Sequence, residues 1–218
     1  MTRFARHLIL FVKAPRFGGV KSRLARDVGP LAAWVFYRRT LQAIFRRLGR
    51  DRRWRTWIAM TPDRAATRPF RPRPPARARM FAQGGGDLGE RMARALAHPP
   101  PGLAVVVGGD IPGILPAHIA EAFRRLGSHD AVFGPAADGG YWLAGFCRRG
   151  RGGAKLAERA FAGVRWSTPH ALADTLENLR GANLRGIRIA PPLDQLEDVD
   201  DGAAFARLHK MVTSSSAP

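Results

Sequence analysis

Short apolar runs alternate with longer amphipathic segments along this chain, a pattern typical of a mostly parallel sheet flanked by helices. The runs that predict strands are residues 7–13, 54–60, 79–82, 103–108, 130–134, 141–146 and 187–190. Helical spacing of apolar residues predicts helices over 31–48, 87–97, 116–126, 154–162, 169–179 and 203–211. We expect residues 14–26 and 61–76 to form loops, the first basic and glycine-bearing and the second rich in proline. The chain therefore predicts a single-domain α/β/α sandwich over residues 1–212, with a flexible tail at 213–218.

Composition agrees with one globular domain of 218 residues, since 45% are hydrophobic and 24% charged. The longest apolar runs, such as Leu103 to Val107, are far shorter than the roughly 20 residues of a membrane helix. The run from Leu8 to Val12 is too short for the apolar region of a signal peptide. Cys147 is the only cysteine, which excludes an internal disulfide and a cysteine-rich zinc site. We expect a soluble, cytoplasmic protein.

The charge is strongly positive, with 36 Lys and Arg against 17 Asp and Glu and a net charge of +19. A nucleic-acid binder concentrates such charge on one arm or face, whereas these residues are spread along the chain, with one denser patch at 46–55. No zinc-finger, RNA-recognition or basic-zipper spacing is present. The field attracts polyanions non-specifically and equally favours a phosphorylated small substrate. We expect no specific nucleic-acid partner.

Asp110 is the most informative acidic residue, because it follows the apolar run 103–108 directly within Gly109-Asp110-Ile111-Pro112. Ligands of open α/β sheets bind beyond the carboxyl ends of the strands. A carboxylate there suits a divalent ion that also contacts substrate phosphates. The alternative is a turn residue that caps the next helix.

A second acidic run, residues 197–201, could complete this site through Asp198 or Asp200. These two side chains share one face if the segment is extended. The alternative is a solvated loop that caps the helix starting near Gly202, where acidic residues favour the helix dipole.

The loop after the first predicted strand carries Gly18, Gly19, Lys21 and Arg23. Glycines let backbone N–H groups approach phosphates, and the two cations add charge. The segment is not a P-loop, because Val20 precedes Lys21 where that motif requires glycine. An ordinary basic surface loop is the alternative.

Two further glycine-rich segments could line a pocket. In residues 83–92, Gln83 could recognise a base edge, although Glu90 and Arg91 also suit an exposed helix. In Asp138-Gly139-Gly140-Tyr141-Trp142, an acid before paired glycines and aromatics suits a sugar or acceptor pocket, and it equally suits a hairpin turn.

Six ordered segments together resemble a known family. They are 11–15 with 19–24, 83 with 86–92, 108–112, 138–142, 166–168 and 198–200. This series is similar to the domain-of-unknown-function family 2064, which is labelled as a glycosyltransferase of the arsenosugar-biosynthesis type. The family is placed among the nucleotide-diphospho-sugar transferases with the GT-A fold. The resemblance spans roughly residues 7–210.

The resemblance implies roles for particular residues. Asp110 and Asp200 would hold Mg²⁺ or Mn²⁺. Asp138 matches the family's Asp-Gly-Gly-Tyr segment, and our own hypothesis makes it the candidate base or acceptor-orienting group. The implied nucleotide-binding residues are Lys13, Gly18, Gly19, Lys21, Arg23, Gln83, Gly84, Asp87 and Asp110. The implied acceptor-binding residues are Gly139, Gly140, Tyr141 and Trp166. The sequence departs from the family at Ser22, usually threonine, at Gly109, often serine or threonine, and at 201–204.

The resulting hypothesis is a metal-dependent transferase that moves a glycosyl group from a sugar nucleotide to a small acceptor. The cations of Lys21 and Arg23 would stabilise charge as it develops. One alternative is a nucleotidyltransferase that condenses an NTP with a phosphorylated small molecule and releases pyrophosphate. Another is a non-catalytic protein that binds a nucleotide or nucleic acid.

Overall fold

A six-stranded sheet forms the centre of the protein in the computed structural model, which describes residues 4–149, 153–181 and 186–214. The strand order is β3-β2-β1-β4-β6-β5. The strands are β1 (Arg6–Lys13), β2 (Arg55–Thr61), β3 (Arg79–Ala82), β4 (Leu103–Gly108), β5 (Ala131–Pro135) and β6 (Tyr141–Cys147). The first four are mutually parallel, and β6 runs antiparallel to both β4 and β5. The predicted mixed, mostly parallel sheet is confirmed.

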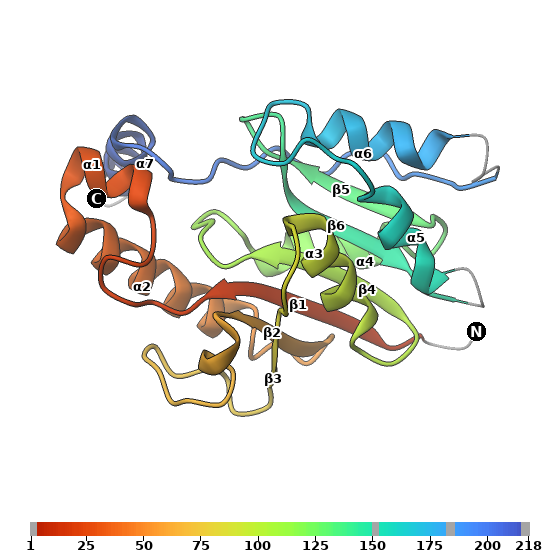
Figure 1. Ribbon diagram of the computed structural model, residues 1–218, viewed down its shortest axis with the longest axis horizontal. Coiled ribbons are helices and arrows are strands. Elements are labelled where there is room, and N and C mark those ends of the chain that lie inside the picture. Colours follow the sequence, from red (N-terminus) through yellow and green to blue (C-terminus); the bar gives the residue numbers. More distant parts are fainter. Residues whose placement is uncertain (1–3, 150–152, 182–185, 215–218) are drawn as a thin grey trace.

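Helices cover both faces of this sheet (Figure 1). They are α1 (Ser22–Val28), α2 (Pro30–Arg47), α3 (Leu88–Ala97), α4 (Pro116–Arg125), α5 (Gly153–Ala160), α6 (Ala171–Arg180) and α7 (Gly202–Ser214), and a short 3₁₀ turn, η1, spans Asp63–Ala65. The buried side chains of α2 and α4 share one apolar cluster with one face of the sheet, and those of α3, α5 and α6 share another with the opposite face. The three-layer sandwich predicted from the sequence is therefore confirmed.

Strand β1 shows why its continuous apolar run predicts helices on both faces of the sheet. Leu8, Leu10 and Val12 are fully buried against the α2 side, and Ile9 is fully buried against the α3 side. Successive residues of a strand face opposite sides of the sheet, so a continuous apolar run is required where both faces carry helices.

Two predicted boundaries are wrong in detail. Residues 14–26 were expected to form a loop, but α1 begins inside them at Ser22. Residues 187–190 form no regular strand; they contribute one parallel bridge, Ile189 to Ala131, because the two prolines that follow have no N–H to extend a ladder. Residues 213–214, expected to belong to the flexible tail, lie in α7, and residues 215–218 lie outside the described residues.

Within the described parts of the chain, no helix combines the length and apolar character needed to cross a membrane.

Candidate functional site

The candidate site lies at the carboxyl ends of β1 and β4. These strands are neighbours in the sheet, yet β1 connects onward to β2 on one side while β6 lies on the other side of β4. Their following loops therefore lead to opposite sides, and in open α/β sheets such a point at the carboxyl ends of the strands is the usual ligand position. A hydrogen bond of 3.1 Å from Gly109 N to Phe11 O holds the two strand ends together.

Lys21 joins two carboxylates at this edge. Its Nζ lies 2.9 Å from Asp110 Oδ2 and 2.5 Å from Asp200 Oδ1. The Lys21 side chain is only 4% exposed, whereas those of Asp110 and Asp200 are 35% and 44% exposed. The ammonium is thus enclosed while both carboxylates keep an open side, so a ligand can reach their oxygens.

The local charges shift three pKa values. Burial alone would lower the pKa of Lys21, but Asp110 and Asp200 raise it above its ordinary value, so the ammonium stays charged. Burial alone would raise the pKa of Asp200, but Lys21 holds it below its ordinary value. Burial and the charges of Asp200, Asp110 and Asp138 raise the pKa of Asp198 to about 7, against the opposing effect of Lys21.

The backbone places Lys21 directly before α1. This residue has φ 50° and ψ 49°, a left-handed conformation that few non-glycine residues adopt. Its carbonyl accepts a hydrogen bond of 2.8 Å from Ala25 N, which begins the helix. Three residues later, Leu24 of α1 is buried in an apolar cluster with Ala33 of α2. The helix start therefore turns the Lys21 side chain into the site.

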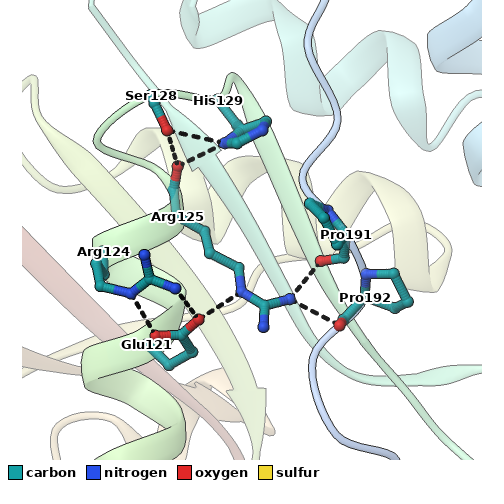
Figure 2. Close-up of polar contacts among 7 residues, drawn as sticks. All are labelled: Glu121, Arg124, Arg125, Ser128, His129, Pro191 and Pro192. Carbon is teal, nitrogen blue, oxygen red and sulfur yellow. Dashed lines mark hydrogen bonds and ion pairs between the residues drawn. The ribbon is translucent and has the colours of Figure 1, made fainter.

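Asp200 reaches the site through a long C-terminal segment that packs along β5. Arg125, on α4, donates from Nη1 to the carbonyls of Pro191 at 2.6 Å and Pro192 at 2.7 Å (Figure 2). Leu193 N and Leu196 N then bond to carbonyl oxygens of β5, at 3.0 and 3.2 Å. These contacts fix the direction of the chain as it approaches the site.

The last residues of the segment are fixed by burial and by a cap. Val199 is buried in an apolar cluster with Leu24 of α1 and Ala33 of α2. The N–H of Gly202 donates to Asp27 Oδ2 at 2.7 Å. Because Val199 faces this cluster, its neighbours Asp198 and Asp200 lie on the other side, facing Lys21.

The carboxylates suit a hard divalent cation. Asp110, Asp198 and Asp200 offer oxygen ligands, and the two carboxylates of Asp110 and Asp200 share the single ammonium of Lys21. In the described parts of the chain, no three Asp, Glu, His or Cys side chains stand in a ready ligand arrangement. Mg²⁺ in proteins is usually bound through one or two carboxylates, with substrate phosphates supplying other ligands.

The phosphate loop, as we call the basic segment between β1 and α1 that was predicted to hold phosphates, has further residues near Lys21 that differ in exposure. Gly18, Arg23 and the Lys13 side chain are exposed, and Gly19 is half-buried. Arg23 is close enough to help lower the pKa of Asp200. Exposed cations beside the buried Lys21 would remain free to meet an incoming anion.

Tyr37 is a site residue that the sequence did not single out. Its hydroxyl donates to Lys13 O at 2.7 Å and accepts from Lys13 N at 3.1 Å, at the end of β1. Burial, and secondly the charge of Asp110, raise the pKa of this phenol. Tyr37 holds the start of the phosphate loop, but its helical position resembles that of any core aromatic, so no sequence signal distinguished it.

Gln83 does not present its amide to a ligand, contrary to the interpretation as a base-recognition residue. It is 1% exposed, and its Nε2 donates to Ala59 O at 2.8 Å and Val12 O at 3.2 Å. Its Oε1 accepts from Arg91. The side chain therefore ties the ends of β1 and β2 to α3, because a buried amide must satisfy its hydrogen bonds internally.

Asp87 and Gly84 also have structural partners. Asp87 is the N-cap of α3: its Oδ1 accepts from Glu90 N at 2.8 Å, and its N–H donates to Glu90 Oε2 at 2.9 Å. Gly84 N donates to Asp63 Oδ1 at 3.1 Å. The predicted helix cap is confirmed, and base recognition by Asp87 would have to coexist with capping.

The predicted acceptor segment forms the turn between β5 and β6. Asp138 is exposed and its Oδ1 accepts from Gly140 N at 2.9 Å. Gly139 has φ +83° and would collide with Pro169 if it carried a side chain. The hairpin-turn interpretation holds, and Asp138 also lies near enough to Asp198 to raise its pKa.

Tyr141 and Trp166 belong to an aromatic cluster rather than to an open pocket wall. Their ring centroids are 6.3 Å apart, and both rings pack against Phe161. Burial raises the pKa of Tyr141. Both side chains are half-buried and pack against the apolar cluster on the α3 side of the sheet.

Residues 43–168 match the model of the family described as "Uncharacterized protein conserved in bacteria (DUF2064)". The chain belongs to this family. No functionally curated protein matches the sequence.

Among solved structures, a protein from Desulfovibrio desulfuricans G20, provisionally described as a nucleotide-diphospho-sugar transferase, is 28% identical with a TM-score of 0.80. The match covers 97% of this chain and 89% of that one. Rv0371c from Mycobacterium tuberculosis H37Rv is 17% identical with a TM-score of 0.57, and the match covers 96% of this chain and 100% of that one. A structure of Rv0371c in complex with manganese is 16% identical with a TM-score of 0.51, and the match covers 95% of this chain and 98% of that one. CMP:2-keto-3-deoxy-manno-octonic acid synthetase with CTP is 13% identical with a TM-score of 0.53, covering 97% and 99%. The family member described here thus has the nucleotide-diphospho-sugar transferase fold, as its sequence predicted.

Proposed function

We propose that this protein is a nucleotide-using transferase, and that it transfers a glycosyl group from a sugar nucleotide to a small acceptor in a metal-dependent reaction. The observation that carries the proposal is the Asp110–Lys21–Asp200 arrangement at the carboxyl ends of β1 and β4. The similarity to the Desulfovibrio protein, at 28% identity over 97% of this chain, supports a sugar nucleotide as the donor.

The donor's diphosphate would lie over the loop after β1. Lys21 is buried and charged, so it is a fixed cation that needs little reorganisation when negative charge develops on a leaving diphosphate. Arg23, exposed on the first turn of α1, can add a second contact. Tyr37 holds the backbone of Lys13 and with it the start of this loop.

Asp110 and Asp200 would hold Mg²⁺ or Mn²⁺, with Asp198 beside them. When bound, such an ion supplies Lewis-acid neutralisation of phosphate oxygens and so favours departure of the nucleotide. In the described structure, Lys21 already neutralises part of this carboxylate charge. Binding a dication there would therefore require the lysine to share the carboxylates or to turn toward the phosphates.

Asp138 is the side chain that we propose to orient or deprotonate the acceptor. It is exposed on the β5–β6 turn, and one of its oxygens is held by Gly140 N. That hydrogen bond fixes the carboxylate while its second oxygen stays available. That oxygen could act as a general base and accept the proton of an acceptor hydroxyl.

A nucleotidyltransferase is the second candidate. The buried cation Lys21 and the adjacent Arg23 also suit the longer run of negative charge of a nucleoside triphosphate. The shared fold with a synthetase solved with CTP supports this candidate. It would release pyrophosphate, whereas the glycosyltransferase would release a nucleoside diphosphate.

Product analysis distinguishes the two reactions. Purified protein with Mg²⁺ or Mn²⁺ would be incubated with panels of sugar nucleotides and NTPs and with hydroxylated and phosphorylated acceptors. Formation of nucleoside diphosphate from one sugar nucleotide supports glycosyl transfer. Formation of pyrophosphate from an NTP supports nucleotidyl transfer and overturns the first proposal. Asp110→Asn should abolish either product, whereas the matched control Asp194→Asn, at an exposed aspartate, should not.

A further inference from the structure

A second cleft, lined mainly by arginine, opens on the α2 side of the molecule. Its volume is about 980 Å³, and it lies between α2 and the loop that joins η1 to β3. None of Lys21, Asp110, Asp198 or Asp200 lines it. The cleft is therefore separate from the candidate transferase site.

The helix wall of this cleft follows from sequence spacing. Arg38, Gln42, Arg46 and Arg50 recur every four residues along α2 and the turn after it, so they share one face. All four line the cleft, together with the neighbouring Arg39 and Arg52. The buried stripe of α2 is used against the sheet, which leaves this basic face outward.

The loop wall adds three more guanidinium groups. Arg71, Arg73 and Arg77 alternate with prolines, including Pro72 and Pro74, and all of these line the cleft. Proline restricts φ and limits the backbone conformations available to the loop. The prolines thus restrict the backbone that carries these arginines.

Packing fixes the two walls against each other. Phe70, at the start of the loop wall, meets Phe45 of α2 edge to face with ring centroids 6.4 Å apart. Gly49 lies so close to Pro75 that a side chain at Gly49 would collide with the proline ring. The shape of the cleft is therefore set by packing between α2 and the loop.

The charge of the cleft is uncompensated. No carboxylate lines it, and none of its eight arginines has an ion-pair partner among the residues that the structure describes. Asp51 lines a neighbouring cavity instead, and its carboxylate is paired with Arg53 at 2.6 Å. Arginines held near one another repel, so an anion that bridged them would be stabilised by both walls at once.

The basic surface continues beyond this cleft. The neighbouring cavity, of about 450 Å³, shares Arg50, Arg52 and Arg77 and adds Arg55, Arg79 and Asp51. Arg55 and Arg79 are the first residues of β2 and β3, so this end lies at the amino edge of the sheet. The combined surface is longer than a single phosphate needs and lies away from the carboxyl edge that carries Lys21.

The lining favours phosphates over bases. Single-stranded nucleic acids bind through exposed aromatic rings on which bases stack. Here Phe45 and Trp54 are 3% and 6% exposed, and Arg53 covers the Trp54 ring. A duplex presents a broad convex surface that does not enter a cleft between two walls. The geometry points to a chain of closely spaced phosphates without bases: we propose that the arginine cleft binds a linear polyphosphate.

Titration calorimetry at moderate salt tests this with inorganic tripolyphosphate and a longer inorganic polyphosphate as probes. The longer chain should bind at least about tenfold more tightly than orthophosphate, because more contacts release more counterions. Arg46→Gln with Arg73→Gln, one residue from each wall, should weaken binding about tenfold and lower the salt dependence. Arg159→Gln with Arg180→Gln removes the same two charges from exposed positions elsewhere and should change affinity less than about twofold.

Three results would overturn the proposal. Equal loss in the two double variants would mean that net charge alone attracts the probe. A single-stranded oligonucleotide that binds more tightly than polyphosphate through Arg46 and Arg73 would assign the cleft to nucleic acid. Loss of binding in Lys21→Ala would place the probe in the transferase site. Polyphosphate binding that survives Lys21→Ala supports the arginine cleft whether or not the proposed transferase activity is found. A second pair, Arg50→Gln with Arg77→Gln, replaces the first if that variant fails to fold.

Discussion

Lys21 Nζ and Asp200 Oδ1 lie 2.5 Å apart although 179 residues separate them in the chain. Asp110 completes the arrangement from the end of β4. Three distant segments, each following a different part of the sheet, thus converge on one enclosed ammonium. The competition between this ammonium and an added cation makes the site testable.

Replacing Lys21 should separate metal binding from nucleotide binding. In Lys21→Ala, Mn²⁺ alone should bind several-fold more tightly, because the positive charge that competes for Asp110 and Asp200 is gone. Affinity for a sugar nucleotide should fall. Electron paramagnetic resonance of free Mn²⁺ measures the first effect and calorimetry the second. Weaker Mn²⁺ binding in this variant would show that Lys21 and the metal do not share the carboxylates.

Gln83 should matter for stability and not for base selectivity. Gln83→Ala removes hydrogen bonds to Ala59 O and Val12 O and leaves Arg91 without its buried partner, so we expect a loss of roughly 1–3 kcal/mol in the free energy of unfolding. Urea denaturation measures this change, with the exposed Gln195→Ala as control. The ranking of nucleotides by affinity should stay the same. A changed ranking would restore base recognition to Gln83.

The contact between Arg125 and the prolines should stabilise the C-terminal segment. Arg125→Met keeps much of the side-chain stem but loses the bonds to Pro191 O and Pro192 O and the ion pair with Glu121, at a cost of roughly 1–2 kcal/mol. Arg124→Met loses only an exposed ion pair with Glu121 and should cost clearly less. Thermal and urea unfolding compare the two. Equal losses would mean that the carbonyl bonds contribute nothing.

His7 should make stability fall in acid. Its ring is fully buried, Nδ1 accepts from Trp57 at 3.1 Å, and Nε2 has no partner among the described residues. Burial, then the charges of Arg148 and Arg55, lower its pKa to about 4 from 6.5. The unfolded chain therefore binds the proton first, and the free energy of unfolding falls by up to about 3 kcal/mol as pH drops from 6.5 toward 4.

Urea denaturation across that pH range measures this effect. His7→Gln should flatten the pH dependence over this window, whatever its effect on stability at neutral pH. The exposed Gln195→Ala, which removes no titratable group, is the control for the denaturation measurement. An unaltered slope in His7→Gln would contradict the assignment.

Local patterns were sufficient for much of the fold. The run 103–108 and the Gly109-Asp110 turn are contiguous, so β4 and the position of Asp110 at its end followed from sequence alone. Asp87 was predictable as a cap for the same reason, since its partner Glu90 is three residues away.

Long-range geometry was not accessible from the sequence. The acidic run 197–201 could equally have been a solvated cap, because its contact with Lys21 depends on the path of residues 191–196 along β5. Gln83 looked available because it stands beside three glycines, yet tertiary packing buries it. The left-handed backbone conformation of Lys21, directly before α1, could not be predicted either, because lysine rarely adopts it.

Calorimetric titration of a sugar-nucleotide panel, with and without Mn²⁺, tests the central claim most directly. The protein, Asp110→Asn and the control Asp194→Asn would be compared at the same salt concentration. We predict that at least one sugar nucleotide binds tightly only with Mn²⁺, that Asp110→Asn removes this metal dependence, and that Asp194→Asn retains it. Metal-dependent binding of the same affinity in Asp110→Asn would contradict the proposed site, as would the absence of binding by every nucleotide tested.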